Sequence, residues 1–82
     1  MVRVFFDDNF KNIFSKIKNN LLRKKIFRQI SKLEQNPEAG KPARYERKGT
    51  RELYIKPLRL SYAYLKSEGK IILLDLYHKK KQ

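Results

Sequence analysis

Residues 51–77 read RELYIKPLRLSYAYLKSEGKIILLDLY and hold three β-prone segments, at about 51–56, 58–66 and 70–77. Pro57 separates the first two, and a turn at residues 67–69 leads into the third. An antiparallel meander is the simplest arrangement of such segments. The last segment is apolar on both pleat faces from Ile71 to Leu76, which is typical of a strand in the centre of a sheet.

Upstream of these segments the hydrophobic pattern changes its period. Residues 2–6 are β-prone and stop at Asp7-Asp8-Asn9, which are natural N-terminal residues for a helix. Apolar residues then recur at helical spacing, which predicts one helix over residues 8–18 and a second that ends at about Gln35, before Asn36-Pro37. Residues 37–50 form a basic connector that could include one short edge strand.

These elements predict an α+β fold in the order β-α-α-β-β-β, formed by a single domain over residues 1–82. The N-terminal helical hairpin should pack on one face of a small, mainly antiparallel sheet of four to five strands. Eighty-two residues bury one modest core, so the functional groups should lie on one surface.

The charge balance narrows the class of partner. The chain has 21 Lys and Arg against 8 Asp and Glu, a formal charge of +13. This excess favours a nucleic acid, an acidic protein or an anionic membrane as the partner. The apolar stripes match a core and leave no face for membrane insertion, and no apolar stretch is long enough to span a bilayer, so a cytoplasmic protein is expected. The chain has no cysteine, no metal-ligand spacing and no cofactor motif.

Four short strings, in this order, resemble the RelE/ParE superfamily of toxins over nearly the whole chain. They are Ile30-x-x-Leu33-x-x-Asn36-Pro37-x-x-Gly40, Arg51-Glu52-Leu53-Tyr54-Ile55, Leu58-Arg59-Leu60-Ser61-Tyr62 and Leu73-Leu74-Asp75-Leu76-Tyr77-His78-Lys79-Lys80. The second and fourth are most similar to the HigB branch. The resemblance implies a RelE-like fold and a toxin of a type II toxin–antitoxin system.

The activity implied by the resemblance is that of a metal-independent, ribosome-dependent endoribonuclease, an mRNA interferase that cuts mRNA in the ribosomal A site and inhibits translation. Its expected partners are mRNA, ribosomal RNA and a cognate antitoxin. Some RelE-type toxins have lysines where this chain has Thr50 and Glu52, and the chain lacks their C-terminal helix. A degenerate toxin or non-catalytic nucleic-acid-binding protein is therefore one alternative, and a ParE-like inhibitor of DNA gyrase is another.

Three residues are candidates for catalysis. Arg59 matches the conserved strand arginine of the family and would stabilise charge on the phosphate, although it could instead be a surface arginine paired with Glu52 or Asp75. His78 could act as a general base, or be merely solvated. Alternation along the strand puts it on the same face as Ile72, Leu74 and Leu76, which is expected to be the core side. Lys79 matches the HigB-like ending and could protonate a leaving group or contact RNA.

Seven further residues are candidates for RNA binding. Tyr54 and Lys56 share a pleat face opposite Leu53 and should join Arg59 on the open face of the sheet, where tyrosine could stack on a base. Arg51 is a phosphate candidate although its pleat face points toward the helices. The others are basic residues of the connector and the C-terminal run: Arg44, Arg47, Lys48 and Lys80. The basic face of the second helix, with Arg23, Lys24, Lys25, Arg28 and Lys32, could meet ribosomal RNA or an acidic antitoxin.

Overall fold

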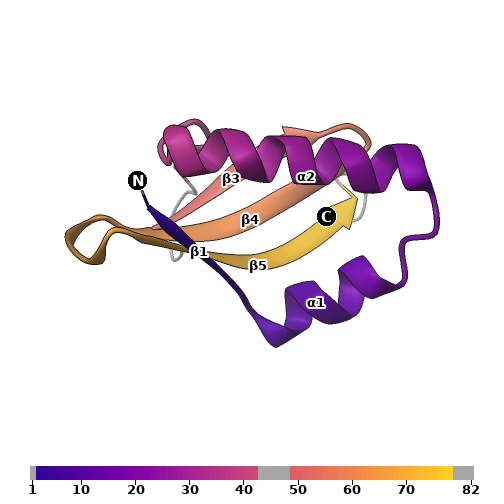
Figure 1. Ribbon diagram of the computed structural model, residues 1–82, viewed down its shortest axis with the longest axis horizontal. Helices are drawn as coiled ribbons and strands as arrows, with labels where there is room; N and C mark the ends of the chain where they lie inside the picture. The colour runs from indigo at the N-terminus through magenta and orange to yellow at the C-terminus, as the bar shows by residue number, and fades with distance from the viewer. Residues whose placement is uncertain (1, 43–48, 79–82) are drawn as a thin grey trace.

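The computed structural model of the protein describes residues 2–42 and 49–78. Its elements follow the order expected from the sequence (Figure 1). They are β1 (Arg3–Phe6), α1 (Asp8–Ser15), α2 (Asn20–Gln35), β2 (Lys41–Pro42), β3 (Thr50–Ile55), β4 (Leu58–Leu65), a single 3₁₀ turn at Lys66–Glu68, and β5 (Lys70–His78). The predicted α+β class is therefore confirmed, including the short edge strand in the connector.

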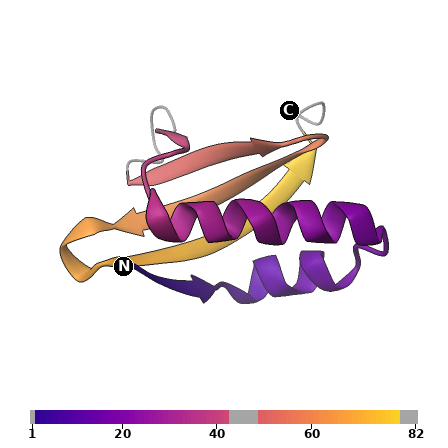
Figure 2. The same cartoon turned by 45° about the horizontal axis from the view of Figure 1, so that its top comes forward.

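The described strands form one sheet in the spatial order β1-β5-β4-β3-β2. Strands β2 to β5 pair antiparallel as a meander, and β1 pairs parallel to β5. Strand β5 therefore has a neighbour on each side, as its apolar character predicted. In Figure 2, α2 crosses in front of the sheet and α1 runs beside it in the opposite direction.

The core lies between the two helices and one face of the sheet. Phe10, Ile26, Ile30 and Leu33 from the helices are all nearly or completely buried. They belong to one cluster with buried residues of the strands, among them Leu60, Tyr62, Ile71 and Leu73. This arrangement covers one face of the sheet and leaves the other free for a functional surface.

A β-bulge changes which residues of β5 enter this core. Ser61 pairs with Asp75 but Tyr62 pairs with Leu73, so Leu74 is an extra residue on β5. The side chain of Asn9 donates a hydrogen bond to the Leu74 carbonyl at 3.0 Å. Because the bulge shifts the alternation, Ile71, Leu73 and Leu76 are the buried residues of β5. The expectation that Ile72 and Leu74 face the core was therefore wrong, whereas that for Leu76 was right.

Local hydrogen bonds explain where the helices begin and end. The side chains of Asp7 and Asn19 cap α1 and α2 by accepting from backbone N–H groups two and three residues further on. Helix α1 ends at Ser15, three residues earlier than predicted. Arg23 of α2 donates to the carbonyls of Phe14 and Ile17 at 3.2 and 2.9 Å, one in the last turn of the shortened helix and one just beyond it.

Candidate functional site

Strand register determines which polar side chains share the open face of the sheet, the face opposite the helices. Residues directly opposite each other in an antiparallel pair point to the same side. Arg59 pairs with Tyr54 on one side and with Tyr77 on the other. The next pairs along this face are Glu52 with Ser61 and Ser61 with Asp75. The open face thus combines one arginine with two tyrosines and two carboxylates.

Arg59, Glu52 and Tyr77 form a connected polar group on this face. Nη1 of Arg59 donates to Oε1 of Glu52 at 3.2 Å, and the Tyr77 hydroxyl donates to Oε2 of the same carboxylate. The Arg59 and Glu52 side chains are 24% and 26% exposed, so solvent screens their ion pair only partly. Within the described part of the chain, the buried Nε of Arg59 has no hydrogen-bond partner. The guanidinium therefore retains donor capacity beside an anion.

A pocket of about 380 Å³ surrounds this group. We call it the sheet-face pocket; its lining residues are Ala39, Lys41, Glu52, Leu53, Tyr54 and Arg59. Tyr54 is 56% exposed, and its ring centroid lies 5.7 Å from the guanidinium carbon of Arg59. Lys41 of β2 pairs with Glu52 and so lies on the same face. The pocket offers a stacking surface beside two cations, which suits a nucleotide with its phosphate.

The family follows from the comparison of this chain with family models. A model described as the ParE toxin of type II toxin–antitoxin systems matches residues 4–82. The chain belongs to the ParE toxin family. This assignment agrees with the resemblance of its strand and helix-end strings to the RelE/ParE toxin superfamily. A search of curated proteins finds no match to this ParE-family toxin.

Solved structures of toxins share the fold of this ParE-family toxin. The RelBE2 toxin–antitoxin complex from Mycobacterium tuberculosis matches with a TM-score of 0.82 and 23% identity, covering 95% of this chain and 98% of the other. The isolated RelE toxin from E. coli matches with a TM-score of 0.81 and 13% identity, covering 100% of this chain and 88% of the other. The archaeal RelE–RelB complex from Pyrococcus horikoshii matches with a TM-score of 0.80 and 15% identity, covering 99% of this chain and 98% of the other. At these identities the likeness concerns the fold, and it confirms the RelE-like architecture.

The structure of the ParE-family toxin brings some of the predicted residues together. Arg59 and Tyr54 are neighbours in the sheet-face pocket. Lys56 is exposed where β3 turns into β4, and its carbonyl accepts a hydrogen bond from Lys25 of α2 at 3.1 Å. Glu52 is indeed the partner of Arg59, the ion pair weighed from the sequence as the alternative to a phosphate contact.

His78 of the toxin lies on the other side of the sheet from Arg59. It pairs with Leu58, whose side chain is buried in the core beneath the helices. It lines a separate pocket of about 300 Å³ whose other lining residues are Ile13, Lys16, Ile17, Leu22, Leu58, Leu76 and Tyr77. The core-side placement expected from the pleat is therefore observed. The structure does not bring the two catalytic candidates Arg59 and His78 into one site.

Several predicted basic contacts of the toxin have structural partners instead. Arg51 points to the helix side, where Nη1 donates to the carbonyls of Glu38 and Gly40 at 3.2 and 2.7 Å. Arg23 is occupied by the end of α1, with its guanidinium carbon 4.4 Å from the Phe14 ring centroid. The exposed cations on α2 are Lys24, Lys25, Arg28 and Lys32. The remaining candidates, Lys79, Lys80, Arg44, Arg47 and Lys48, lie outside the described residues.

Sequence reasoning did not assign Glu52, Lys41 or Tyr77 to the candidate site of the toxin. Alternation along β3 could have found Glu52, because Tyr54 lies two residues further on the same strand. Alternation along β5 could likewise have found Tyr77, because it lies between Leu76 and His78, which were both expected on the core side. Over residues 2–42 and 49–78, no group of acidic or histidine side chains is arranged to hold a metal ion. No helix in those residues is long and apolar enough to cross a membrane.

Proposed function

We propose that this ParE-family toxin cleaves mRNA on the ribosome and uses the sheet-face pocket to do so. The observation that carries the proposal is the pairing of an exposed tyrosine, Tyr54, with a partly buried arginine, Arg59, in one pocket on the free face of the sheet. A base stacked on Tyr54 would place its phosphate beside the guanidinium. The charge of +13 favours approach to ribosomal RNA, and the translating ribosome would place the protein in the cytoplasm.

The proposed reaction is attack of a ribose 2′-oxygen on the adjacent phosphorus. A new P–O bond forms, the bond to the 5′-oxygen breaks, and the products are a 2′,3′-cyclic phosphate and a 5′-hydroxyl. Arg59 stabilises the negative charge on the phosphoryl oxygens in this step. Glu52, displaced from Arg59 by the phosphate, accepts the proton of the 2′-hydroxyl. Lys41 lies on the same face and supplies a proton to the leaving 5′-oxygen.

This proposal changes the part assigned to His78. A general base must come within hydrogen-bond reach of the proton that it removes. His78 lies on the helix side of the sheet, whereas Arg59 and Glu52 share the open face. We therefore assign the role of general base to Glu52 and keep His78 as a variant in the test. Lys79 and Lys80 remain proposed RNA contacts.

A cognate antitoxin is the proposed protein partner. Membership of a type II family implies one, and two solved structures of similar fold are the E. coli RelBE toxin–antitoxin complex and the archaeal RelE–RelB complex. The exposed cations of α2 suit an acidic antitoxin segment or ribosomal RNA.

Inhibition of DNA gyrase is the second candidate function. One observation favours it: the Arg59 guanidinium is already paired with Glu52, whose other oxygen is held by Tyr77. A neutralised pocket is less suited to phosphate than a free one. A toxin of this family with such a pocket could act through a protein target instead.

The test is primer extension on an mRNA translated in a reconstituted system. Wild type is compared with Arg59→Ala, Tyr54→Ala, Glu52→Ala and His78→Ala. Lys18→Ala, at an exposed cation between α1 and α2, is the control. We expect codon-phased breaks that require ribosomes and that fall by about 10²-fold or more in Arg59→Ala. Intact mRNA, together with inhibition of supercoiling by purified gyrase, would establish the second candidate instead.

A further inference from the structure

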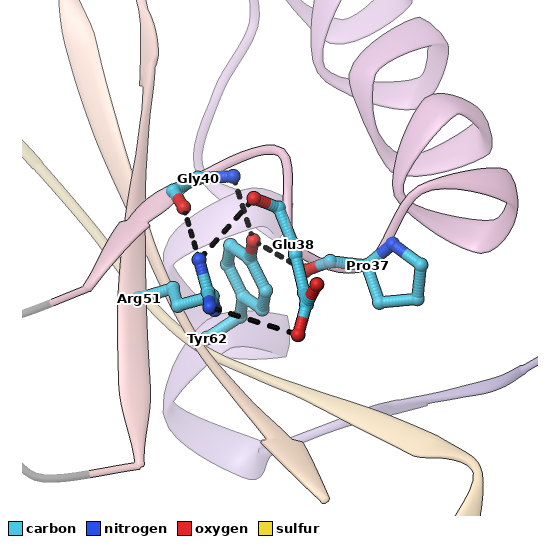
Figure 3. Close-up of polar contacts among 5 residues, drawn as sticks. All are labelled: Pro37, Glu38, Gly40, Arg51 and Tyr62. Atoms are coloured by element: carbon cyan, nitrogen blue, oxygen red, sulfur yellow. Dashed lines mark hydrogen bonds and ion pairs between the residues drawn. The ribbon is translucent and has the colours of Figure 1, made fainter. Parts of the chain in front are cut away.

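The hydroxyl of Tyr62 joins β4 to the turn that follows α2 (Figure 3). Tyr62 is completely buried, and its hydroxyl donates to the Pro37 carbonyl at 2.8 Å while accepting from the Gly40 N–H at 2.9 Å. Burial raises the pKa of Tyr62, although the Gly40 hydrogen bond and the Arg51 charge oppose the increase. The hydroxyl therefore keeps its proton at neutral pH and can serve both backbone groups.

Arg51 holds the same turn from the neighbouring strand. It is paired directly with Tyr62 across β3 and β4, so both side chains lie on the helix side of the sheet. Nη1 donates to the Glu38 and Gly40 carbonyls, and Nη2 lies 3.9 Å from the Glu38 carboxylate (Figure 3). We call these five residues, Pro37, Glu38, Gly40, Arg51 and Tyr62, the Tyr62 network. It satisfies four backbone groups of a turn that has no regular structure of its own, the carbonyls of Pro37, Glu38 and Gly40 and the N–H of Gly40.

Gly40 allows this close approach. A Cβ at position 40 would lie 2.7 Å from the Glu52 carbonyl oxygen, 2.7 Å from the Tyr62 hydroxyl and 2.9 Å from a ring carbon of Tyr62. Two of these three atoms belong to the buried Tyr62 side chain and the third to the backbone, so none can move aside easily. The turn is thus packed directly on β3 and β4 with no side chain between them.

The turn that the Tyr62 network holds also forms the rim of the sheet-face pocket. Ala39 and Lys41 line that pocket and flank Gly40 in the chain. In β2, Lys41 pairs with Glu52 on the open face, while Pro42 pairs with Arg51 on the helix face. The network therefore acts from one side of the sheet on a wall of the pocket that opens on the other side.

We propose that Tyr62 and Arg51 are positioning residues for the sheet-face pocket, fixing the Ala39–Lys41 rim against Glu52 and Arg59. Neither side chain reaches the pocket, so each acts through the Pro37–Gly40 turn. For catalysis this inference rests on the proposed nuclease function. The positioning itself can be measured without any activity.

The first measurement is amide and guanidinium hydrogen exchange by NMR. Tyr62→Phe removes only the hydroxyl, and Ile26→Val, a conservative change in the core on α2, is the control. We expect Tyr62→Phe to accelerate exchange at the Gly40 amide and at the buried Arg59 Nε by about 10-fold or more, since an opened rim exposes both. Faster exchange at Gly40 with an unchanged Arg59 Nε would overturn the proposal, because the turn would then move without affecting the pocket.

The second measurement is mRNA cleavage on the ribosome at a temperature where every variant is folded. Tyr62→Phe should lower the rate about 10-fold, and Ile26→Val should not. Equal rates in the two variants would overturn the catalytic part of the proposal. Absence of cleavage by the wild type would refute the nuclease function and leave the Arg59 Nε exchange to decide positioning. If Tyr62→Phe does not fold, both measurements are repeated with Arg51→Lys. Lysine keeps the charge but loses the forked contact of the guanidinium with the turn.

Discussion

The carboxylate of Glu52 lies between the Arg59 guanidinium and the Tyr77 hydroxyl. In the proposed reaction it has two opposing effects. It competes with the RNA phosphate for Arg59, and it accepts the 2′-hydroxyl proton once the phosphate has displaced it. These effects can be separated, because one concerns binding and the other concerns the chemical step.

Glu52→Gln should separate them. The amide keeps the shape of the side chain and removes its charge, so binding of a short oligoribonucleotide should tighten about 3- to 10-fold. Cleavage on the ribosome should fall by about 10²-fold or more because the base is lost. Fluorescence anisotropy and primer extension measure the two quantities. A variant that cleaves like the wild type would remove Glu52 from the mechanism.

Tyr62 predicts how stability depends on alkaline pH. Its folded pKa lies above the ordinary tyrosine value of 10.0, chiefly because of burial, so above about pH 10 the unfolded chain loses this proton first. The stabilising contribution is complete below about pH 10 and is lost as the pH rises through the folded pKa. Denaturant unfolding at a series of pH values from about 8 upward should show this loss.

The matched variant for that experiment is Tyr62→Phe, which cannot ionise. Its free energy of unfolding at about pH 8 should be lower than that of the wild type by about 1–3 kcal/mol, because two buried backbone groups lose their partner. The gap should narrow as the pH rises above 10. A constant gap across the series would mean that folding does not shift the pKa of Tyr62.

At the scale of elements, the helical hairpin depends on one side chain that the sequence suggested was a surface cation. Arg23 donates to the Phe14 and Ile17 carbonyls and lies over the Phe14 ring. These contacts join the end of α1 to the start of α2. A single guanidinium thus replaces the last turn that the hydrophobic pattern had predicted for α1.

Arg23→Gln should therefore destabilise the fold by about 1–2 kcal/mol, since it removes two hydrogen bonds to backbone carbonyls and a cation–π contact. Arg28→Gln on the same helix serves as the control, because Arg28 is exposed. Thermal unfolding of both variants measures the difference. Equal melting temperatures would show that the Arg23 contacts contribute nothing measurable.

The elements also show how far the sequence could predict this molecule. Hydrophobic period, caps and turn residues were sufficient for the order of elements, for the meander and for the central place of β5. These signals failed within β5, because the extra residue Leu74 reverses the alternation of core-facing and open-face side chains before it. Nothing in the residue types around Leu74 marks a bulge. The pairing of Arg59 with Glu52 was foreseeable from alternation. The contact between Gly40 and Tyr62 was not, because it joins residues 22 positions apart through close packing.

For the whole molecule, the formal charge of +13 predicts that the proposed RNA binding is sensitive to salt. Each phosphate neutralised on a single strand contributes about −0.7 to the slope of log affinity against log salt concentration. Oligoribonucleotide binding titrated from about 50 to 300 mM salt should give a steep slope, and Arg59→Ala should reduce its magnitude by about 0.7. An unchanged slope in Arg59→Ala would mean that this guanidinium holds no phosphate.

The position of β5 also has a consequence during synthesis. Strand β5 lies between β1 and β4 although it follows every other described strand in the chain. A growing chain that has not yet reached Lys70–His78 has no partner for β1 and no central sheet under α1. The apolar face of α1, which packs against β5, then remains uncovered, and exposed apolar surface makes a nascent chain prone to aggregation. The toxin therefore cannot complete its sheet from the N-terminus onward until the last described strand has been made.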